Sequence, residues 1–383
     1  MKITGVELFI VGPRSTFIKV LTDEGITGWG EPIIPRRSET VVAAVEEMAD
    51  WLVGRDPDQI EDIWQTFYRS SFFRGGPILM AAIAGIDQAL WDIKGKRYGL
   101  PVYQLLGGAV RDKMQVYAWI GGDTPEAMAA NARQRVAEGY RAIKVHEGII
   151  NPHYIESFSV VDQAIAKIGA IRDAIGNSIG MGIDFHGHLH KGLAKVMAKE
   201  LEPFHPLFLE EPVLPEHGEA LREIAGHTSI PIATGERLYS RWDFKQVLHD
   251  GYVDIIQPDL SHAGGISEVK KIVAMAEAYD VAVAQHCPLG PIALMACLQI
   301  DAVTPHAFIQ EQAIEIHDPS LDPLMRCLAN PDVFGFKDGY VPLPQGPGLG
   351  IQINEDAVRE AVKQGHRWRP PLCRAHDGTV AEW

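Results

Sequence analysis

Eight short apolar runs recur along the chain from about residue 114, and they constrain the fold more than any other feature of the sequence. Each run leads into an amphipathic stretch, and one run with its stretch takes up roughly 25 residues. Parallel strands need helical crossovers of about this length, so the pattern predicts consecutive βα units. Eight such strands are enough to close a barrel. The runs lie at residues 116–120, 142–145, 181–184, 207–210, 232–235, 253–257, 281–285 and 307–310.

The segments on either side of these runs have a different character. The first thirty residues alternate in strand fashion between turn signals at residues 12–13 and 23–25, which predicts a small antiparallel meander. Helical patterning follows at about residues 38–70 and again at 78–96, and proline-rich, irregular sequence begins after about residue 317. We therefore expect an α/β protein with three parts. These are an α+β capping domain at 1–112, a barrel domain at 113–317, and a C-terminal segment at 318–383 that completes the cap.

The charge balance and the cysteines exclude several classes of protein. The chain has 35 Lys and Arg against 50 Asp and Glu, a formal net charge of −15, whereas binding nucleic acid requires clustered positive charge. The four cysteines form no CxxC or zinc-like array, so neither a disulfide framework nor a structural zinc is expected. The N-terminus lacks the apolar core of a signal peptide, and no run of eighteen apolar residues occurs. We expect a cytoplasmic protein without membrane contact.

Polar residues that bind metals or transfer protons follow nearly every apolar run, at separations of 23 to 27 residues from Asp184 onward. Barrels place their active sites at the carboxyl ends of the strands, so these side chains should meet in one cavity. A single polar residue at a strand end is unremarkable, but one in each βα unit indicates a catalytic centre. In chain order the residues are Lys144 and His146, Asp184 and His186, Glu210, Glu236, Asp259, His286 and Glu311.

Three of these residues, Asp184, Glu210 and Glu236, are carboxylates from consecutive strands. Like charges gathered in a low-dielectric cavity repel one another unless a cation lies among them, so a metal site is predicted. Oxygen ligands favour a hard ion, and Mg²⁺ suits a site that leaves room for substrate and water, with Mn²⁺ as a substitute. Taken singly, each acid could instead cap a helix or pair with a surface base. The strand period of two directs Glu211 to the other face, so Glu210 is the expected ligand.

Two histidines are candidates for proton transfer. His186 and Asp184 are two residues apart in a strand, so both should face the same cavity. Asp259 and His286 follow successive strands, and a carboxylate beside an imidazole raises its basicity and holds one tautomer. The alternative for this pair is a purely structural hydrogen bond between a buried histidine and an aspartate.

Five segments carry a resemblance that extends over essentially the whole chain. They are FRGGPILM at 73–80, AGIDQALWDIKGK at 84–96, QPDLSHAGGI at 257–266, HCPLGP at 286–291 and VAEW at 380–383. In these segments the sequence resembles the enolase superfamily, and within it the mandelate racemase-like branch of acid-sugar dehydratases. The resemblance implies a modified TIM barrel of (β/α)7β type under an α+β capping domain. It also implies a small-molecule sugar acid as substrate and a homo-oligomer, commonly an octamer.

The resemblance assigns roles to the residues at the strand ends. It implies Mg²⁺ ligands at Asp184, Glu210 and Glu236. It further implies a general base at His286 supported by Asp259, a general acid at His186, and Glu311 near the substrate carboxylate. The base would take the C2 proton, and the acid would protonate the departing C3 hydroxyl, which leaves a 2-keto-3-deoxy sugar acid. Abstraction of such a weakly acidic proton requires cations to stabilise the dianionic intermediate.

The second barrel strand departs from the pattern of the superfamily. Racemases and cycloisomerases carry Lys-x-Lys there, whereas this chain has Lys144 and then His146, and the most similar dehydratases have asparagine at the second position. The missing lysine weakens an epimerase or cycloisomerase reading, and His146 leaves the stereochemistry of the substrate open, with gluconate or another aldonate as alternatives. We expect Lys144 and His146 to contact substrate, although a structural lysine is equally compatible with the sequence.

Two more distant alternatives remain at this level. A non-catalytic member that binds a sugar acid would have a damaged set of strand-end residues, whereas here every position is filled. A barrel aldolase or isomerase with an unrelated metal site would leave the pairing of Asp259 with His286 unexplained. Specificity should come from capping loops near residues 13–15, 29–32 and 74–77, which could close over the substrate. Trp29, Phe72 and Phe73 could belong to these loops or to the core.

Overall fold

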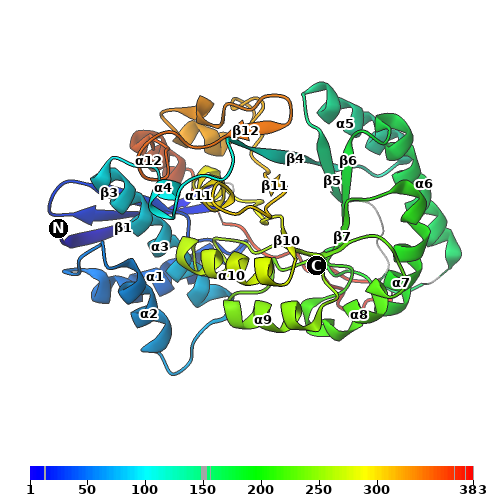
Figure 1. The fold of residues 1–383 in the computed structure, drawn as a ribbon, viewed down its shortest axis with the longest axis horizontal. Helices are drawn as coiled ribbons and strands as arrows, with labels where there is room; N and C mark the ends of the chain where they lie inside the picture. Colours follow the sequence, from blue (N-terminus) through cyan, green and yellow to red (C-terminus); the bar gives the residue numbers. More distant parts are fainter. Residues whose placement is uncertain (13, 148–152, 156, 366, 376, 383) are drawn as a thin grey trace.

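The computed structural model describes residues 1–12, 14–147, 153–155, 157–365, 367–375 and 377–382, and for His146 and Glu147 it describes the backbone alone. A small antiparallel sheet with its helices lies beside a larger ring of parallel strands wrapped in helices (Figure 1). Among the described residues, no helix combines the length and apolar character needed to cross a membrane.

The capping sheet has the order β1-β2-β3 and is antiparallel throughout, as the meander pattern predicts. Helix α3 packs on this sheet at a short distance, because Gly28 and Gly30 carry no side chain. A Cβ on either glycine would lie 2.0 Å from a carbonyl oxygen of α3, of Ala89 or Gly85 respectively. The elements are β1 (Ile3–Val11), β2 (Ser15–Thr22), β3 (Thr27–Gly30), α1 (Ser38–Leu52), α2 (Ile60–Arg69), α3 (Gly76–Tyr98) and α4 (Val102–Leu105).

The structure adds detail to two local expectations for the capping domain. The helical pattern at residues 38–70 is two helices, because Gly54 adopts a positive φ of 87° and Pro57 lies in the break between α1 and α2. Phe72 and Phe73 are not core residues, since 88% and 82% of their surfaces are exposed, while Trp29 is buried.

Eight parallel strands form the barrel in the sequence order β4 to β11, with β11 paired back to β4. The ring closes between β10 and the segment before β11, where the Val283 amide donates to His306 O and the Phe308 amide donates to Val283 O. The described strands are β4 (Lys113–Gly121), β5 (Ala142–Glu147), β6 (Gly180–Asp184), β7 (Phe208–Glu210), β8 (Ile232–Thr234), β9 (Ile255–Ile256), β10 (Ala282–Val283) and β11 (Gln310–Glu311).

A helix connects each barrel strand to the next, which confirms the predicted (β/α)7β architecture with its cap. Helix α5 shows how such helices start, because Thr124 accepts a hydrogen bond from the Ala127 amide at 3.2 Å and Pro125 takes the first position. The helices are α5 (Pro125–Ala137), α6 (Phe158–Ile175), α7 (Lys191–Glu200), α8 (Glu219–Ala225), α9 (Arg241–Asp250), α10 (Ile266–Ala278) and α11 (Pro291–Asp301). Short 3-10 turns lie at Glu202–Phe204, Pro215–His217, Pro323–Cys327 and Pro331–Phe334.

Buried polar contacts join the cap to the barrel through α3 and α10. Asp87 accepts hydrogen bonds from the Ser267 amide at 3.0 Å and from its hydroxyl at 2.5 Å, at the N-terminus of α10. Gln88 donates to Ser261 at 2.9 Å, and the Trp64 indole donates to Gly264 O at 2.7 Å. The AGIDQALWDIKGK and QPDLSHAGGI segments thus meet at this interface.

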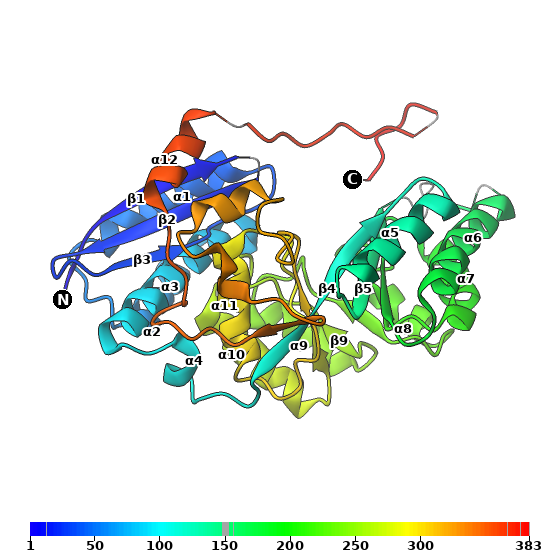
Figure 2. The same cartoon turned by 90° about the horizontal axis from the view of Figure 1, so that it is seen from above.

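The C-terminal part of the chain contacts both the barrel and the cap. Strand β12 (Tyr340–Pro342) pairs antiparallel with β4, and helix α12 (Glu355–Lys363) packs on the cap strand β1. Lys19 forms an ion pair with Glu355 at 2.6 Å, and Arg359 forms one with Glu7 at 2.6 Å. Beyond α12 the chain is extended and runs along one side of the molecule (Figure 2).

Candidate active site

The polar residues at the strand ends gather at the carboxyl end of the barrel. Asp184 ends β6 and Glu210 ends β7, and the two residues are register partners in the parallel sheet. Glu236 follows β8 by two residues. Asp184, His186 and Glu236 each offer one possible ligand atom, and these three atoms lie within 4.8 Å of one another. The structure therefore places two of the three predicted metal ligands in one group, together with the predicted acid.

Lys144 on β5 forms ion pairs with three of the strand-end carboxylates. Its Nζ lies 3.1 Å from Asp184 Oδ2, 2.9 Å from Glu210 Oε1 and 2.6 Å from Glu311 Oε1. The side chain is 1% exposed, and although burial lowers its pKa, the carboxylates of Glu210 and Glu311 raise it well above the ordinary value. The residue is thus a buried cation that balances three acids. The carboxylate of Glu210 contacts this lysine and is not part of the group formed by Asp184, His186 and Glu236.

His186 lies beside Asp184 because of a turn after β6, and not because of the alternation of side chains along a strand. Strand β6 ends at Asp184, and His186 adopts a left-handed conformation with φ 48°. The Asp184 carboxylate accepts the His186 amide proton at 2.8 Å, which stabilises this turn, and His186 Nε2 lies 3.1 Å from Asp184 Oδ2. Burial raises the pKa of Asp184, but His186 and Lys144 outweigh it and hold the pKa below the ordinary value.

Glu211 leaves the regular strand conformation and pairs with Arg237. Its φ is 38°, so the regular alternation stops after Glu210, and its buried carboxylate pairs with Arg237. Burial and the negative charge of Glu236 raise the pKa of Glu211 to about 8. The Arg237 guanidinium also lies 3.9 Å from the Glu236 carboxylate, so it contacts both Glu211 and Glu236.

Asp259 and His286 form a hydrogen-bonded pair. His286 Nδ1 lies 2.7 Å from Asp259 Oδ2, and the backbones of the two residues form a parallel bridge that continues the pairing of β9 with β10. The other ring nitrogen, Nε2, lies 3.2 Å from Glu236 Oε2. Burial lowers the pKa of His286, but Glu236, Glu311 and Asp259 raise it well above the ordinary value. This environment makes His286 an unusually strong base that faces the carboxylate group.

Glu311, the last strand-end residue, is held by groups on three sides. Besides Lys144, its carboxylate accepts the Trp119 indole proton at 2.7 Å and the Cys287 amide proton at 2.9 Å. Burial raises the pKa of Glu311, yet Lys144 and His286 lower it to about 2. The residue is an ionised acceptor of fixed orientation beside the base. The side chain of His146 lies outside the described part of the chain.

The cluster has the features of a divalent cation site. Asp184 Oδ2 and Glu236 Oε2 are buried, and their contacts are ion pairs, with Lys144 Nζ at 3.1 Å from the first and His286 Nε2 at 3.2 Å from the second. Several carboxylates gathered in a buried cavity repel one another, which favours a further positive charge among them. Oxygen donors supplemented by open positions match the preference of Mg²⁺. Asp184, Glu236 and the neighbouring Glu210 are thus chemically suited to hold it.

Two capping loops approach the barrel mouth as the sequence suggests. Glu31 accepts hydrogen bonds from the Gly290 amide at 2.8 Å, the Ala293 amide at 3.0 Å and the Ser15 hydroxyl, so it caps helix α11 just after His286. Burial raises the pKa of Glu31 to about 7. The third loop behaves differently, because Arg74 lies over the ring of Tyr68 at 5.6 Å, within the cap. Pro13 lies outside the described residues.

Several residues of the site are absent from the sequence-based set. His262 is buried beside the base pair, with its Nδ1 3.5 Å from Asp259, and burial lowers its pKa. Trp119, Arg237 and Glu31 also contact strand-end residues or the loop after His286. His262 and Arg237 carried a usable signal, because His262 is the third residue after Asp259 in a tight turn and Arg237 directly follows Glu236. Trp119 and Glu31 are distant in sequence from their partners, Glu311 and Gly290.

The chain is similar to known proteins in sequence and in structure over nearly its whole length. Residues 12–107 match the mandelate racemase / muconate lactonizing enzyme N-terminal domain, and residues 127–357 match the enolase C-terminal domain-like family. The chain is 54% identical to D-galactonate dehydratase of Ralstonia pickettii and 53% identical to that of Pectobacterium atrosepticum, in both cases over all 383 residues and 100% of each chain. A solved enolase structure from Pantoea ananatis, with bound D-gluconate and Mg, matches with a TM-score of 0.90 and 32% identity over 99% of both chains.

Proposed function

The chain belongs to the mandelate racemase / muconate lactonizing enzyme family of the enolase superfamily, and we propose that it is a magnesium-dependent D-galactonate dehydratase. The reaction removes the C2 proton and the C3 hydroxyl of D-galactonate, which gives 2-dehydro-3-deoxy-D-galactonate and one water. The sequence motifs described above also resemble galactonate dehydratases more than other acid-sugar dehydratases. The enzyme is a hydro-lyase.

One observation carries the proposal: two imidazoles from different strand ends lie against two different carboxylates of the same cluster. His286 Nε2 lies 3.2 Å from Glu236, and His186 Nε2 lies 3.1 Å from Asp184. Elimination of water needs a base for a carbon-bound proton and an acid for a leaving hydroxyl, and two separately placed imidazoles supply both. His186 follows β6 and His286 follows β10, and these two strands lie on different sides of the barrel mouth.

The metal would be held by Asp184, Glu210 and Glu236. When bound, Mg²⁺ supplies positive charge that stabilises the negative charge developing on the substrate carboxylate. Lys144 fixes the orientation of Glu210 and Glu311 through ion pairs at 2.9 and 2.6 Å. Burial and the charge of Asp184 raise the pKa of Glu210 well above its ordinary value, so the positive charge of the ion would favour its ionised form. Glu210 would have to share its oxygens between this lysine and the ion.

His286 would take the C2 proton on Nε2, because Nδ1 is occupied by the hydrogen bond to Asp259. Asp259 orients the ring and stabilises the imidazolium that results. His186 would donate its Nε2 proton to the C3 hydroxyl as water leaves, and the side chain of Asp184 fixes the turn that presents it. Glu311 and Trp119 border the base and restrict the position of the substrate carboxyl end.

Two other substrates or reactions on the same scaffold have specific support. The Pantoea ananatis structure holds D-gluconate, which favours gluconate as the second candidate substrate. An epimerase or cycloisomerase would share the first proton transfer but return a proton to carbon. The absence of a second lysine after Lys144 argues against that reaction.

A panel of aldonates and aldarates in D₂O separates these possibilities. Formation of semicarbazide-reactive keto acid from D-galactonate, faster than from D-gluconate, is the expected result. Keto acid formed from gluconate alone would identify gluconate as the substrate instead of galactonate. Deuterium at C2 of the recovered sugar acid, without keto acid, would exclude dehydration. Addition of EDTA should abolish turnover, and excess Mg²⁺ should restore it.

Two variants assign the roles. His286→Asn should retain Mg²⁺ binding and lose turnover, because the base is not a ligand. Glu236→Gln should weaken Mg²⁺ affinity in a titration that follows binding directly. Unaltered turnover of the first variant, or unaltered affinity of the second, would refute the corresponding assignment.

A further inference from the structure

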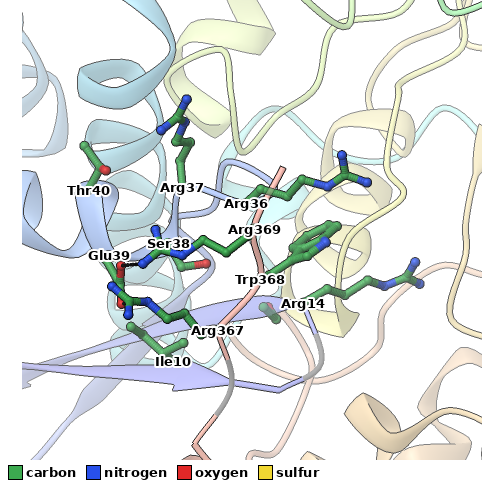
Figure 3. A pocket seen from close by; sticks show the side chains of 11 residues that line it. Ile10, Arg14, Arg36, Arg37, Ser38, Glu39, Thr40, Arg367, Trp368 and Arg369 are labelled. Carbon is green, nitrogen blue, oxygen red and sulfur yellow. Dashed lines mark ion pairs between the residues drawn. The ribbon is translucent and has the colours of Figure 1, made fainter. Parts of the chain in front are cut away.

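A second cavity with an unusual charge lies in the cap (Figure 3). Three segments line it: the β1–β2 hairpin, residues 36–40 at the start of α1, and residues 367–369 of the C-terminal tail. Its empty volume is about 450 Å³, including the solvent at its mouth. We call it the arginine cavity. The catalytic carboxylates and histidines are not among its lining residues.

Positive charge dominates the arginine cavity. Five arginines line it, whereas Glu39 is the single carboxylate among its described lining residues. Arg367 lies 3.3 Å and Arg369 lies 3.7 Å from that carboxylate, so one acid is shared by two bases. Four positive charges are therefore in excess, on a chain whose formal net charge is −15. Such local concentration of one sign attracts anions. The five are Arg14, Arg36, Arg37, Arg367 and Arg369.

The guanidinium of Arg36 is held in a defined position. It lies 5.4 Å from the centre of the Trp368 indole, and Figure 3 shows Trp368 between Arg36 and Arg14. This stacking uses the face of the guanidinium, whereas oxyanions bind along its edge, so the two contacts are compatible. Arg36 adopts φ 66°, a conformation that is unfavourable for residues other than glycine. Burial lowers the pKa of this guanidinium below its ordinary value.

The first turn of α1 adds to the attraction. Ser38, Glu39 and Thr40 begin this fifteen-residue helix and line the cavity, and the N-cap residue Arg37 makes no side-chain capping bond. Backbone amides at a helix N-terminus carry partial positive charge and point toward bound oxyanions. Helix and guanidinium groups thus favour the same kind of ligand.

The arginine cavity borders the barrel mouth without being part of it. Arg14 donates to Ala313 O at 2.7 Å, and Ala313 is two residues beyond Glu311. Ser15, on the same hairpin, donates to Glu31, which caps the helix after the loop of His286. A ligand in the cavity would therefore lie next to residues that support the catalytic base.

We propose that the arginine cavity is an oxyanion-binding site, separate from the catalytic centre, that takes a carboxylate or phosphate group. Guanidinium groups bind both groups through paired hydrogen bonds, so the geometry is the same for either. Two sources can supply the ligand: the carboxylate of a sugar acid or free inorganic phosphate.

Isothermal titration in EDTA distinguishes the sources, with inorganic phosphate in one arm and D-galactonate in the other. The double variant Arg36→Gln with Arg367→Gln should bind the ligand at least tenfold more weakly than the unaltered protein. Arg133→Gln on α5, an exposed arginine outside the cavity, is the matched control and should bind normally. Heat from phosphate identifies free phosphate as a ligand, and heat from galactonate alone identifies the sugar acid.

The proposal fails if neither anion binds, or if binding is the same in the double variant and in the unaltered protein. Galactonate binding that survives the arginine substitutions would belong to the catalytic centre and would count against the sugar acid as the ligand of the cavity. Should the double variant not fold, Arg37→Gln provides the same test, because this arginine is exposed and its loss removes no buried contact. Keto-acid formation by each variant is measured in parallel, so that failure of the cavity and failure of the dehydratase proposal are distinguished.

Discussion

The pair of Asp259 and His286 permits a sharp test of how the base works. Asp259→Asn changes neither size nor shape but reverses one hydrogen bond. The aspartate oxygen Oδ1 accepts the His262 amide at 3.0 Å, so the asparagine oxygen should remain there and its amide nitrogen should face His286 Nδ1. The imidazole must then accept at Nδ1 and carry its proton on Nε2. That nitrogen faces Glu236 and would be the one required to accept the substrate proton.

The expected loss of rate follows from this change in two steps. A charge-assisted hydrogen bond contributes about 1.5–3 kcal/mol, which corresponds to roughly a 10- to 150-fold effect on a rate that depends on it. The unfavourable tautomer adds to this, and the same substitution in the Ser-His-Asp triad of serine proteases lowers kcat by about 10⁴. We therefore expect kcat of Asp259→Asn to fall by about 10² to 10⁴.

Keto-acid formation from D-galactonate measures the effect, because the keto acid forms only after the C2 proton has been removed. The rate of its formation should decline, while Mg²⁺ affinity should stay within about twofold. Asp254→Asn is the matched control. Asp254 lies at the opposite, N-terminal end of β9, where its carboxylate accepts the Ile232 amide at 2.9 Å, so kcat should not change. A kcat for Asp259→Asn within about threefold of the unaltered enzyme would refute the reasoning.

Two further changes test buried charges. Lys144→Met removes the cation that lies within 3.1 Å of three buried carboxylates, and in EDTA the free energy of unfolding by urea should fall by about 3–5 kcal/mol, with partial recovery in excess Mg²⁺. Equal stability in EDTA would contradict this. Asp301, which accepts from Gln285 at 2.7 Å, has its pKa raised by burial from 3.8 to about 7. The folded protein thus retains a proton that the unfolded chain loses, and stability declines as pH rises through this window. Asp301→Asn should remove that decline and gain up to about 4 kcal/mol relative to the unaltered protein between pH 4 and 8, measured by urea unfolding. A difference independent of pH would contradict it.

The arginine cavity (Figure 3) could not be predicted from the sequence. It joins residues 14 and 36 to residue 367, which is more than 300 positions further along the chain, and no local pattern marks them as neighbours. The same holds for Glu31 and Gly290, whose contact joins the cap to the loop after His286. Such contacts depend on how the cap is placed on the barrel.

Strand-end conformation was equally hidden from the sequence. Alternation along β6 and β7 assumes that each strand continues, whereas His186 and Glu211 take positive φ angles and leave the strand. His186 still reaches Asp184, and Glu211 pairs with Arg237, which also lies 3.9 Å from Glu236. The number of carboxylates that Lys144 would contact also followed only from packing, because a buried ammonium turns toward whichever acids surround it.

The sequence by itself determined the barrel and the order in which its polar residues follow one another. Apolar runs at a spacing of about 25 residues leave a chain few ways to bury them other than parallel βα units, and in such units every strand end lies on one side. Tertiary structure alone decided which charges pair, which turns reach the cavity and where the tail meets the cap. These depend on distances between segments that are remote along the chain, and on the cost of leaving buried charges without partners.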